Sequence, residues 1–199
     1  MKTLEKSLLF AAVAATLAIG SAAQGAEYKV KVLPTAEDPT QKTVLVGRTL
    51  TNNMLVTFEI EAAKAMWMPM GKAGKWMEHA PSSKERFHIE VKPIDPVSQT
   101  RLSYANVKFD ATNKDSGKKI QAQLHPMWGG SGLHYTVNSA LAGDGIYEAR
   151  ITVGVPAFAR DMKNKALWDK PTTATFHFKL AGGKLIEVSE PVDEVPVKK

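Results

Sequence analysis

Short segments in which apolar and polar residues alternate follow one another along most of the chain. The clearest is residues 86–92, where Phe87, Ile89 and Val91 share one face of an extended segment. Similar segments predict strands at residues 44–50, 55–63, 102–110, 119–125, 133–140, 146–155, 172–180 and 184–189. No stretch shows sustained helical periodicity or an internal repeat. The pattern therefore predicts an all-β protein, folded as an antiparallel β-sandwich.

Two of the connections are longer than a sandwich needs, at residues 66–85 and 156–171, and long ordered connections often carry function. The first is rich in possible soft metal ligands: Met66, Met68, Met70, Met77 and His79. If residues 66–70 are extended, their three methionines share a face. Thioethers favour copper(I), but methionines also fill irregular gaps in a core, here beside Trp67 and Trp76. Both interpretations stay open.

The first 26 residues differ from the rest and are typical of an export signal. Lys2 and Lys6 precede an apolar run over residues 8–19, and small residues follow it. We expect a signal peptide at residues 1–26, a sandwich domain at 27–190 and a loose, charged tail at 191–199. The protein is accordingly expected in the periplasm, without stable membrane insertion, because no segment is long and apolar enough to span a bilayer.

The composition narrows the chemistry further. The chain has 199 residues, 44% of them hydrophobic, which is enough for one packed core. It has no cysteine, which excludes disulfides, thiolate metal sites and cysteine nucleophiles. The net charge is +6, but the basic residues are scattered and no run of five occurs, so we expect no nucleic-acid partner.

Two short motifs carry candidate metal ligands. His88 and Glu90 lie two apart in a predicted strand, so both side chains leave the face opposite the apolar one. Farther on, a glycine-rich bend separates Met127 from His134, and three glycines within residues 129–132 allow the backbone to fold tightly enough to bring the two together. Taken singly, each motif also fits an ordinary exposed strand face or a flexible hairpin.

The combination resembles a known family, the periplasmic metal-binding proteins that assist high-affinity iron uptake. The resemblance covers roughly residues 55–180 and rests on several spaced motifs. They are Pro81-Ser82-Ser83-Lys84 leading into His88-Ile89-Glu90, the turn Asn113-Lys114-Asp115-Ser116-Gly117, Pro126-Met127, Gly132-Leu133-His134-Tyr135 and Gly145-Ile146-Tyr147. It implies an immunoglobulin-like sandwich with long metal-site loops that forms a homodimer and binds copper and iron.

The resemblance also implies the ligands. His88, Met127 and His134 match the family's copper ligands, and Glu90 matches the carboxylate beside the copper. The family's further histidine, from the long loop before the last core strands, is absent here, and Asp161 or Met162 could replace it. The family's aspartate in the bend is Ser131, and its proline is Leu133. Met68, Met70 and His125 are additional candidate ligands.

The resemblance favours a binding protein rather than an enzyme. It would capture iron, with copper at the same or an adjacent site, and support delivery to an inner-membrane iron permease. The alternative is a copper(I) chaperone or copper-tolerance protein that uses the methionine-rich loop. A third interpretation is a carbohydrate-binding or adhesive sandwich, in which Trp67, Trp76 and Trp128 form a stacking platform.

Overall fold

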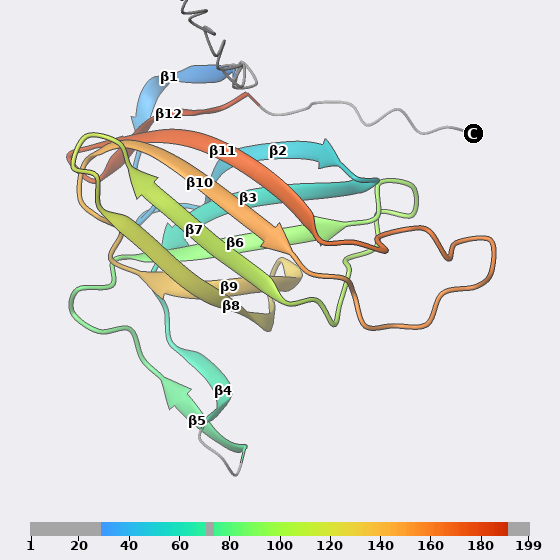
Figure 1. Ribbon diagram of the computed structural model, residues 1–199. Helices are drawn as coiled ribbons and strands as arrows, with labels where there is room; N and C mark the ends of the chain where they lie inside the picture. The colour runs from blue at the N-terminus through green and yellow to red at the C-terminus, as the bar shows by residue number, and fades with distance from the viewer. Residues whose placement is uncertain (1–28, 71–73, 191–199) are drawn as a thin grey trace, which may run out of the picture.

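The computed structural model describes residues 29–70 and 74–190. The expected signal peptide at 1–26 and the expected tail at 191–199 therefore lie outside the described residues. The described residues form twelve strands and no α-helix: β1 (Val30–Glu37), β2 (Val44–Thr51), β3 (Met54–Ala62), β4 (Met66–Met70), β5 (Lys75–His79), β6 (Phe87–Ile94), β7 (Val107–Asn113), β8 (Lys119–Gly129), β9 (Gly132–Ser139), β10 (Gly145–Val153), β11 (Thr172–Ala181) and β12 (Lys184–Ser189). The all-β prediction is confirmed (Figure 1). Among these residues nothing has the length and apolarity of a membrane-crossing helix.

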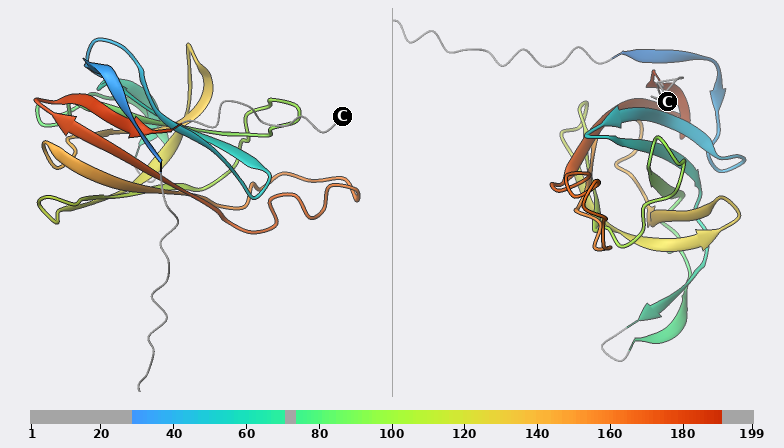
Figure 2. Two further views of the ribbon diagram at one scale, coloured as in Figure 1. Left: turned by 90° about the horizontal axis from the view of Figure 1, so that it is seen from above. Right: turned by 90° about the vertical axis from the view of Figure 1, so that its right-hand side faces the viewer.

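The strands form two antiparallel layers joined by one long strand. One layer runs β1-β12-β11-β10-β7-β8, the other β8-β9-β6-β3-β2. Strand β8 belongs to both, because residues 119–124 pair with β7 and residues 125–129 pair with β9. Seen from its right-hand side, the molecule shows the two layers curving toward each other (Figure 2). The predicted sandwich is therefore confirmed, with β8 as the strand that changes layers.

The core between the layers is aromatic at its centre. Phe58, on β3, packs against Phe109 and Phe176 of the other layer, with ring centroids 5.7 Å and 5.5 Å away. Residues 87, 89 and 91 of β6 point into the same core and are almost completely buried. Because side chains alternate along a strand, the neighbouring positions 88, 90 and 92 must leave the opposite face of the layer.

The two layers also approach each other along one edge, where β2 lies beside β11 and β12. Gly47 makes this approach possible. A Cβ atom at this position would lie only 2.6 Å from Cδ1 of Phe176 and 2.9 Å from Cβ of Ser189. The missing side chain is what lets β2 pack this closely against the opposite layer.

The structure corrects the predicted elements in three places. Residues 66–70 and 75–79, predicted as parts of a long loop, pair as the strands β4 and β5, and this hairpin extends away from the sandwich (Figure 1). Strand β1 was not predicted, because it is mostly exposed and pairs only with β12. Strand β7 begins at Val107 rather than 102, since the hydroxyl of Tyr135 bonds both the carbonyl of Leu102 and the amide of Ala105 and holds that segment as a loop.

Candidate metal centre

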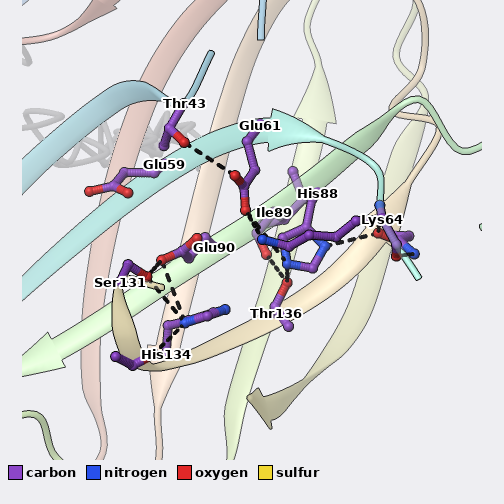
Figure 3. Close-up of polar contacts among 12 residues, drawn as sticks. Thr43, Glu59, Glu61, Lys64, His88, Ile89, Glu90, Ser131, His134 and Thr136 are labelled. Atoms are coloured by element: carbon purple, nitrogen blue, oxygen red, sulfur yellow. Dashed lines mark hydrogen bonds and ion pairs between the residues drawn. The ribbon is translucent and has the colours of Figure 1, made fainter. Parts of the chain in front are cut away.

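The predicted ligands lie on the outer face of the layer β8-β9-β6-β3. In an antiparallel pair, residues directly opposite each other point to the same side. The register places His88 opposite both Glu61 and Asn138, and Glu90 opposite Glu59 and Thr136. It also places Met127 opposite His134. Residues from four neighbouring strands thus form one polar surface, which Figure 3 shows in part.

His88, on β6, is completely buried, contrary to what an outward strand face would suggest. Its Nδ1 lies 2.9 Å from Oδ1 of Asn138, which can only accept, so Nδ1 carries the proton. The lone pair is then on Nε2, which lies 2.5 Å from the hydroxyl of Thr136. Burial lowers the pKa of His88, so the imidazole is neutral at pH 7, the form that binds metals.

His134, at the start of β9, is held in the same way. Its Nδ1 lies 2.8 Å from the carbonyl oxygen of Gly132, so Nδ1–H donates and Nε2 keeps a lone pair. The residue is 1% exposed, and Nε2 has no hydrogen-bond partner in the described structure. Its ring centroid lies 6.3 Å from that of His88. A buried nitrogen with a free lone pair beside a second imidazole is what a metal site requires.

The bend between β8 and β9 brings His134 to this position. Gly132 has a φ of +80°, a left-handed conformation that glycine adopts without strain. At Gly129 an added Cβ would lie 3.1 Å from Cε1 of His134, so this glycine leaves room for the ring. The predicted convergence of Met127 and His134 across the bend is therefore present in the strand pairing.

Glu90 is almost completely buried between Lys92 and the bend. Its Oε1 lies 2.8 Å from Nζ of Lys92, accepts a 2.6 Å hydrogen bond from Ser131, and is 3.6 Å from Nδ1 of His134. Burial alone would raise the pKa of Glu90, but the hydrogen bonds from Lys92 and Ser131 outweigh it and lower the pKa to about 2. The carboxylate is therefore ionised at every physiological pH, and Ser131 serves as its hydrogen-bond donor.

Two further carboxylates, which the sequence did not single out, lie on β3 beside these residues. Glu59 pairs with the ammonium of Lys92. Glu61 pairs with Lys64, and its Oε1 lies 4.0 Å from Nε2 of His88 (Figure 3). Both glutamates alternate with Phe58 and Ile60 in the sequence, so the strand pattern did place them on the outward face. What the pattern could not show is which neighbouring strand they face.

Met127 lies where this polar surface meets a cavity of about 340 Å³ beneath the β4–β5 hairpin. The cavity is lined by Met66, Trp67, Met68, Pro69, Trp76, His125, Pro126, Met127, Trp128 and Thr136. Thr136, the partner of His88, shares its wall. The structure thus brings together two of the predicted additional ligands, Met68 and His125, with Met127. The three exposed tryptophans of the carbohydrate interpretation line the same cavity.

The other additional candidates lie elsewhere. Met70 ends β4, and its side chain lies outside the described part of the structure. Asp161 is exposed and accepts hydrogen bonds from Lys163 and Asn164 in its own loop. Asp161 borders a separate cavity that none of the four main candidates lines. Met162 is 77% exposed. Among the described residues, no hydrogen bond, ion pair or shared cavity joins either residue to His88 or His134, so the structure does not assign the missing histidine's place to them.

Among the described residues, no group of three or more histidines and carboxylates has the geometry of a metal coordination site. Nε2 of His88 lies 2.5 Å from the hydroxyl of Thr136, and Oε1 of Glu90 is held by Lys92 and Ser131. The donors nevertheless fit a metal. Two imidazoles with their lone pairs on Nε2 and a thioether suit copper, and a carboxylate beside them suits a harder ion such as iron(II).

Comparison with known proteins places this chain in a family. The sequence profile described as Fe2+ transport protein matches residues 49–182. The chain belongs to this Fe2+ transport protein family. The match spans β3 to β11 and so includes all four main candidates. A search of curated protein sequences found no significant match.

Two solved structures show that the fold of this chain occurs in other proteins. FetP from uropathogenic Escherichia coli strain F11 is 20% identical, with a TM-score of 0.56 over 75% of this chain and 98% of FetP. Copper-reconstituted P19 from Campylobacter jejuni is 20% identical, with a TM-score of 0.54 over 70% of this chain and 97% of P19. At this identity the likeness establishes the shared fold.

Proposed function

We propose that this protein captures iron in the periplasm, with copper at the same or an adjacent site, and supports its delivery to an inner-membrane iron permease. It acts as a binding protein and not as an enzyme, and as a homodimer. Membership of the Fe2+ transport protein family supports the iron cargo. The copper-bound state of the structurally similar P19 supports copper as a second metal.

The observation that carries the proposal is the buried, unpartnered Nε2 of His134. Leaving such an atom without a hydrogen bond is unfavourable by about 1–3 kcal/mol, unless a ligand takes up its lone pair. His88, whose lone pair is also on Nε2, and Met127 lie beside it. Both imidazoles are fixed through Nδ1 by a protein oxygen, as is usual for histidines that bind metals.

Each of the four residues has a distinct part in this proposal. His88 and His134 provide nitrogens that either metal accepts, and Met127 provides the soft donor that favours copper. Glu90 provides the hard oxygen that favours iron, and its low pKa keeps it charged. Ser131 holds the Glu90 carboxylate through its hydroxyl without adding a second negative charge.

The test is a titration of the purified chain with Mn2+, as a redox-stable substitute for iron(II), and with Cu2+. We expect one ion per chain, and His134→Gln should weaken both affinities by at least about tenfold. His177→Gln is the matched control, because His177 is also buried but lies on β11 in the other layer. Equal affinities in the wild type and in folded His134→Gln would refute the assignment of the site.

The cavity beneath the β4–β5 hairpin supports a second candidate function, a copper(I) chaperone. Met66, Met68 and Met127 offer thioethers, and His125 an imidazole, around one space. We expect the double variant Met66→Leu/Met68→Leu, which conserves volume, to lower copper(I) affinity and leave Mn2+ affinity unchanged. Met54→Leu in the core is the control. Binding of sugars in the presence of a chelator would instead favour the tryptophan platform.

A further inference from the structure

We propose that Lys92 competes with the metal cation for Glu90, and that Glu59 takes up the lysine when the metal binds. This inference rests on the proposed function, because it takes Glu90 to be a metal ligand. It adds that the protein carries its own competing cation, which weakens metal binding and so favours release.

The geometry places one ammonium between two carboxylates. Nζ of Lys92 is paired with Glu59 and lies 2.8 Å from Oε1 of Glu90. The two glutamates are directly opposite each other on β3 and β6, and Lys92 follows Glu90 by two positions on the same face. The side chains of Lys92 and Glu90 are 7% and 3% exposed, and that of Glu59 is 17% exposed.

The lysine has opposite effects on the metal-free and the metal-bound protein. Without a metal, two like charges directly opposite on neighbouring strands would repel each other, and the lysine removes that repulsion. When a metal is bound, the lysine is a positive charge close to a second cation. The two cations repel each other, and they compete for the same carboxylate of Glu90. The lysine therefore stabilises the metal-free protein and opposes the loaded one.

Glu59 allows the ammonium of Lys92 to leave Glu90 and still keep one carboxylate as a partner. A buried ammonium that loses its only partner is strongly unfavourable. Because Lys92 already contacts Glu59, it can give up Glu90 and keep one carboxylate. The exchange needs only a small movement of Nζ along the face of the layer, and no change of the backbone.

Replacing Lys92 and replacing Glu59 should change Mn2+ affinity in opposite directions. Lys92→Met removes the competitor, so Mn2+ should bind more tightly, by on the order of tenfold. Glu59→Gln leaves Lys92 with Glu90 as its only carboxylate, so Mn2+ should bind more weakly. The double variant Glu59→Gln/Lys92→Met removes one charge of each sign, and any tightening in it arises from lost competition rather than from a change in net charge.

The experiment measures Mn2+ affinity by calorimetry, and thermal unfolding with and without Mn2+, for these three variants. Lys179→Met is the matched control, because Lys179 is a paired lysine on β11 in the other layer. Metal-free Lys92→Met should unfold at a lower temperature than the wild type, and Mn2+ should raise that temperature by more than it does in the wild type.

Tighter Mn2+ binding in the double variant, with weaker binding in Glu59→Gln, supports the inference. Unchanged or weaker binding in a folded double variant overturns it, and this measurement stands even if Lys92→Met alone fails to fold. The proposed function is tested separately by Glu90→Gln and His134→Gln. If those two variants also leave Mn2+ affinity unchanged, the assignment of the metal site is wrong. If they lose Mn2+ binding, the site is right and only the proposed competition by Lys92 is wrong.

Discussion

At the scale of single residues, the two histidines and the glutamate among the candidate ligands are each held by a neighbouring group that is not itself a candidate ligand. Asn138 fixes His88, the carbonyl of Gly132 fixes His134, and Ser131 with Lys92 fixes Glu90. The side-chain partners come from β6, β9 and the bend, so the orientation of each ligand depends on correct strand pairing. Replacing such a partner should change metal affinity through the ligand that it holds.

Asn138→Leu tests this dependence. Asn138 accepts from Nδ1 of His88 and donates to the carbonyl of Lys64. Without the amide, the His88 ring is free to take the other tautomer or to turn, so metal affinity should fall by about 10- to 100-fold. Calorimetric titration with Cu2+ measures this, with the exposed Asn164→Leu as the control. Unaltered Cu2+ affinity in a folded Asn138→Leu would mean that metal binding does not depend on the hydrogen bond at Nδ1 of His88.

The sequence predicts His88, Glu90, Met127 and His134 as one group, because their spacing within two motifs resembles a family pattern. The strand register places them on one face of neighbouring strands, and their role as metal ligands stays a prediction. It did not indicate Glu59, Lys92 or Asn138. Each of these acts through a neighbour on another strand, and pairing between strands is decided by the folded register. The burial of His88 and Glu90 was likewise not predicted, because alternation marks their face as outward.

At the scale of elements, prediction succeeded where a strand has one apolar face in the core and failed where it has none. Strands β3, β6 and β10 each place apolar residues at alternate positions in the core and were predicted with small errors at their ends. Strands β1, β4 and β5 have little or no contact with the core, so their residues carry no such alternation. Hydrogen bonding to a neighbouring strand, which leaves no trace in hydropathy, defines them.

The β8–β9 bend offers a test at this scale. Gly132→Ala places a Cβ on a residue with φ of +80°, which should reduce the free energy of unfolding by about 1–2 kcal/mol. Gly130→Ala, in the same bend, has open space around the added Cβ and no left-handed φ, and should change little. Urea unfolding of both variants measures the difference. Equal losses would show that the bend is not constrained by Gly132.

At the scale of the whole molecule, the two layers each bury a histidine whose pKa is lowered by burial, His88 on β6 and His177 on β11. Above the ordinary histidine pKa of about 6.5, neither the folded nor the unfolded chain is protonated at these positions. Below it, the unfolded chain binds protons that the folded chain does not. Stability is therefore present above that pH and is lost as the pH falls through the lower, folded-state values.

Urea unfolding between about pH 7.5 and pH 5 should show this loss, at up to about 1.4 kcal/mol per pH unit for each histidine. In His177→Gln the slope should be smaller. Glu90 contributes to the slope only toward pH 5 and below, where the unfolded chain begins to bind a proton at its ordinary pKa of 4.5 while the folded carboxylate, with a pKa of about 2, stays ionised. An identical slope in the variant and the wild type would contradict the contribution of His177.

The position of the candidate ligands on the outward face of β6 has a consequence for how such proteins diverge. Ile89 and Val91 build the core, while the alternate positions hold the ligands and their partners. A lineage can therefore exchange a histidine, a carboxylate or a counter-charge without repacking the interior. The apolar packing between the layers is then left as it is, and the effect of such an exchange on folding is confined to the hydrogen bonds and ion pairs of the outward face.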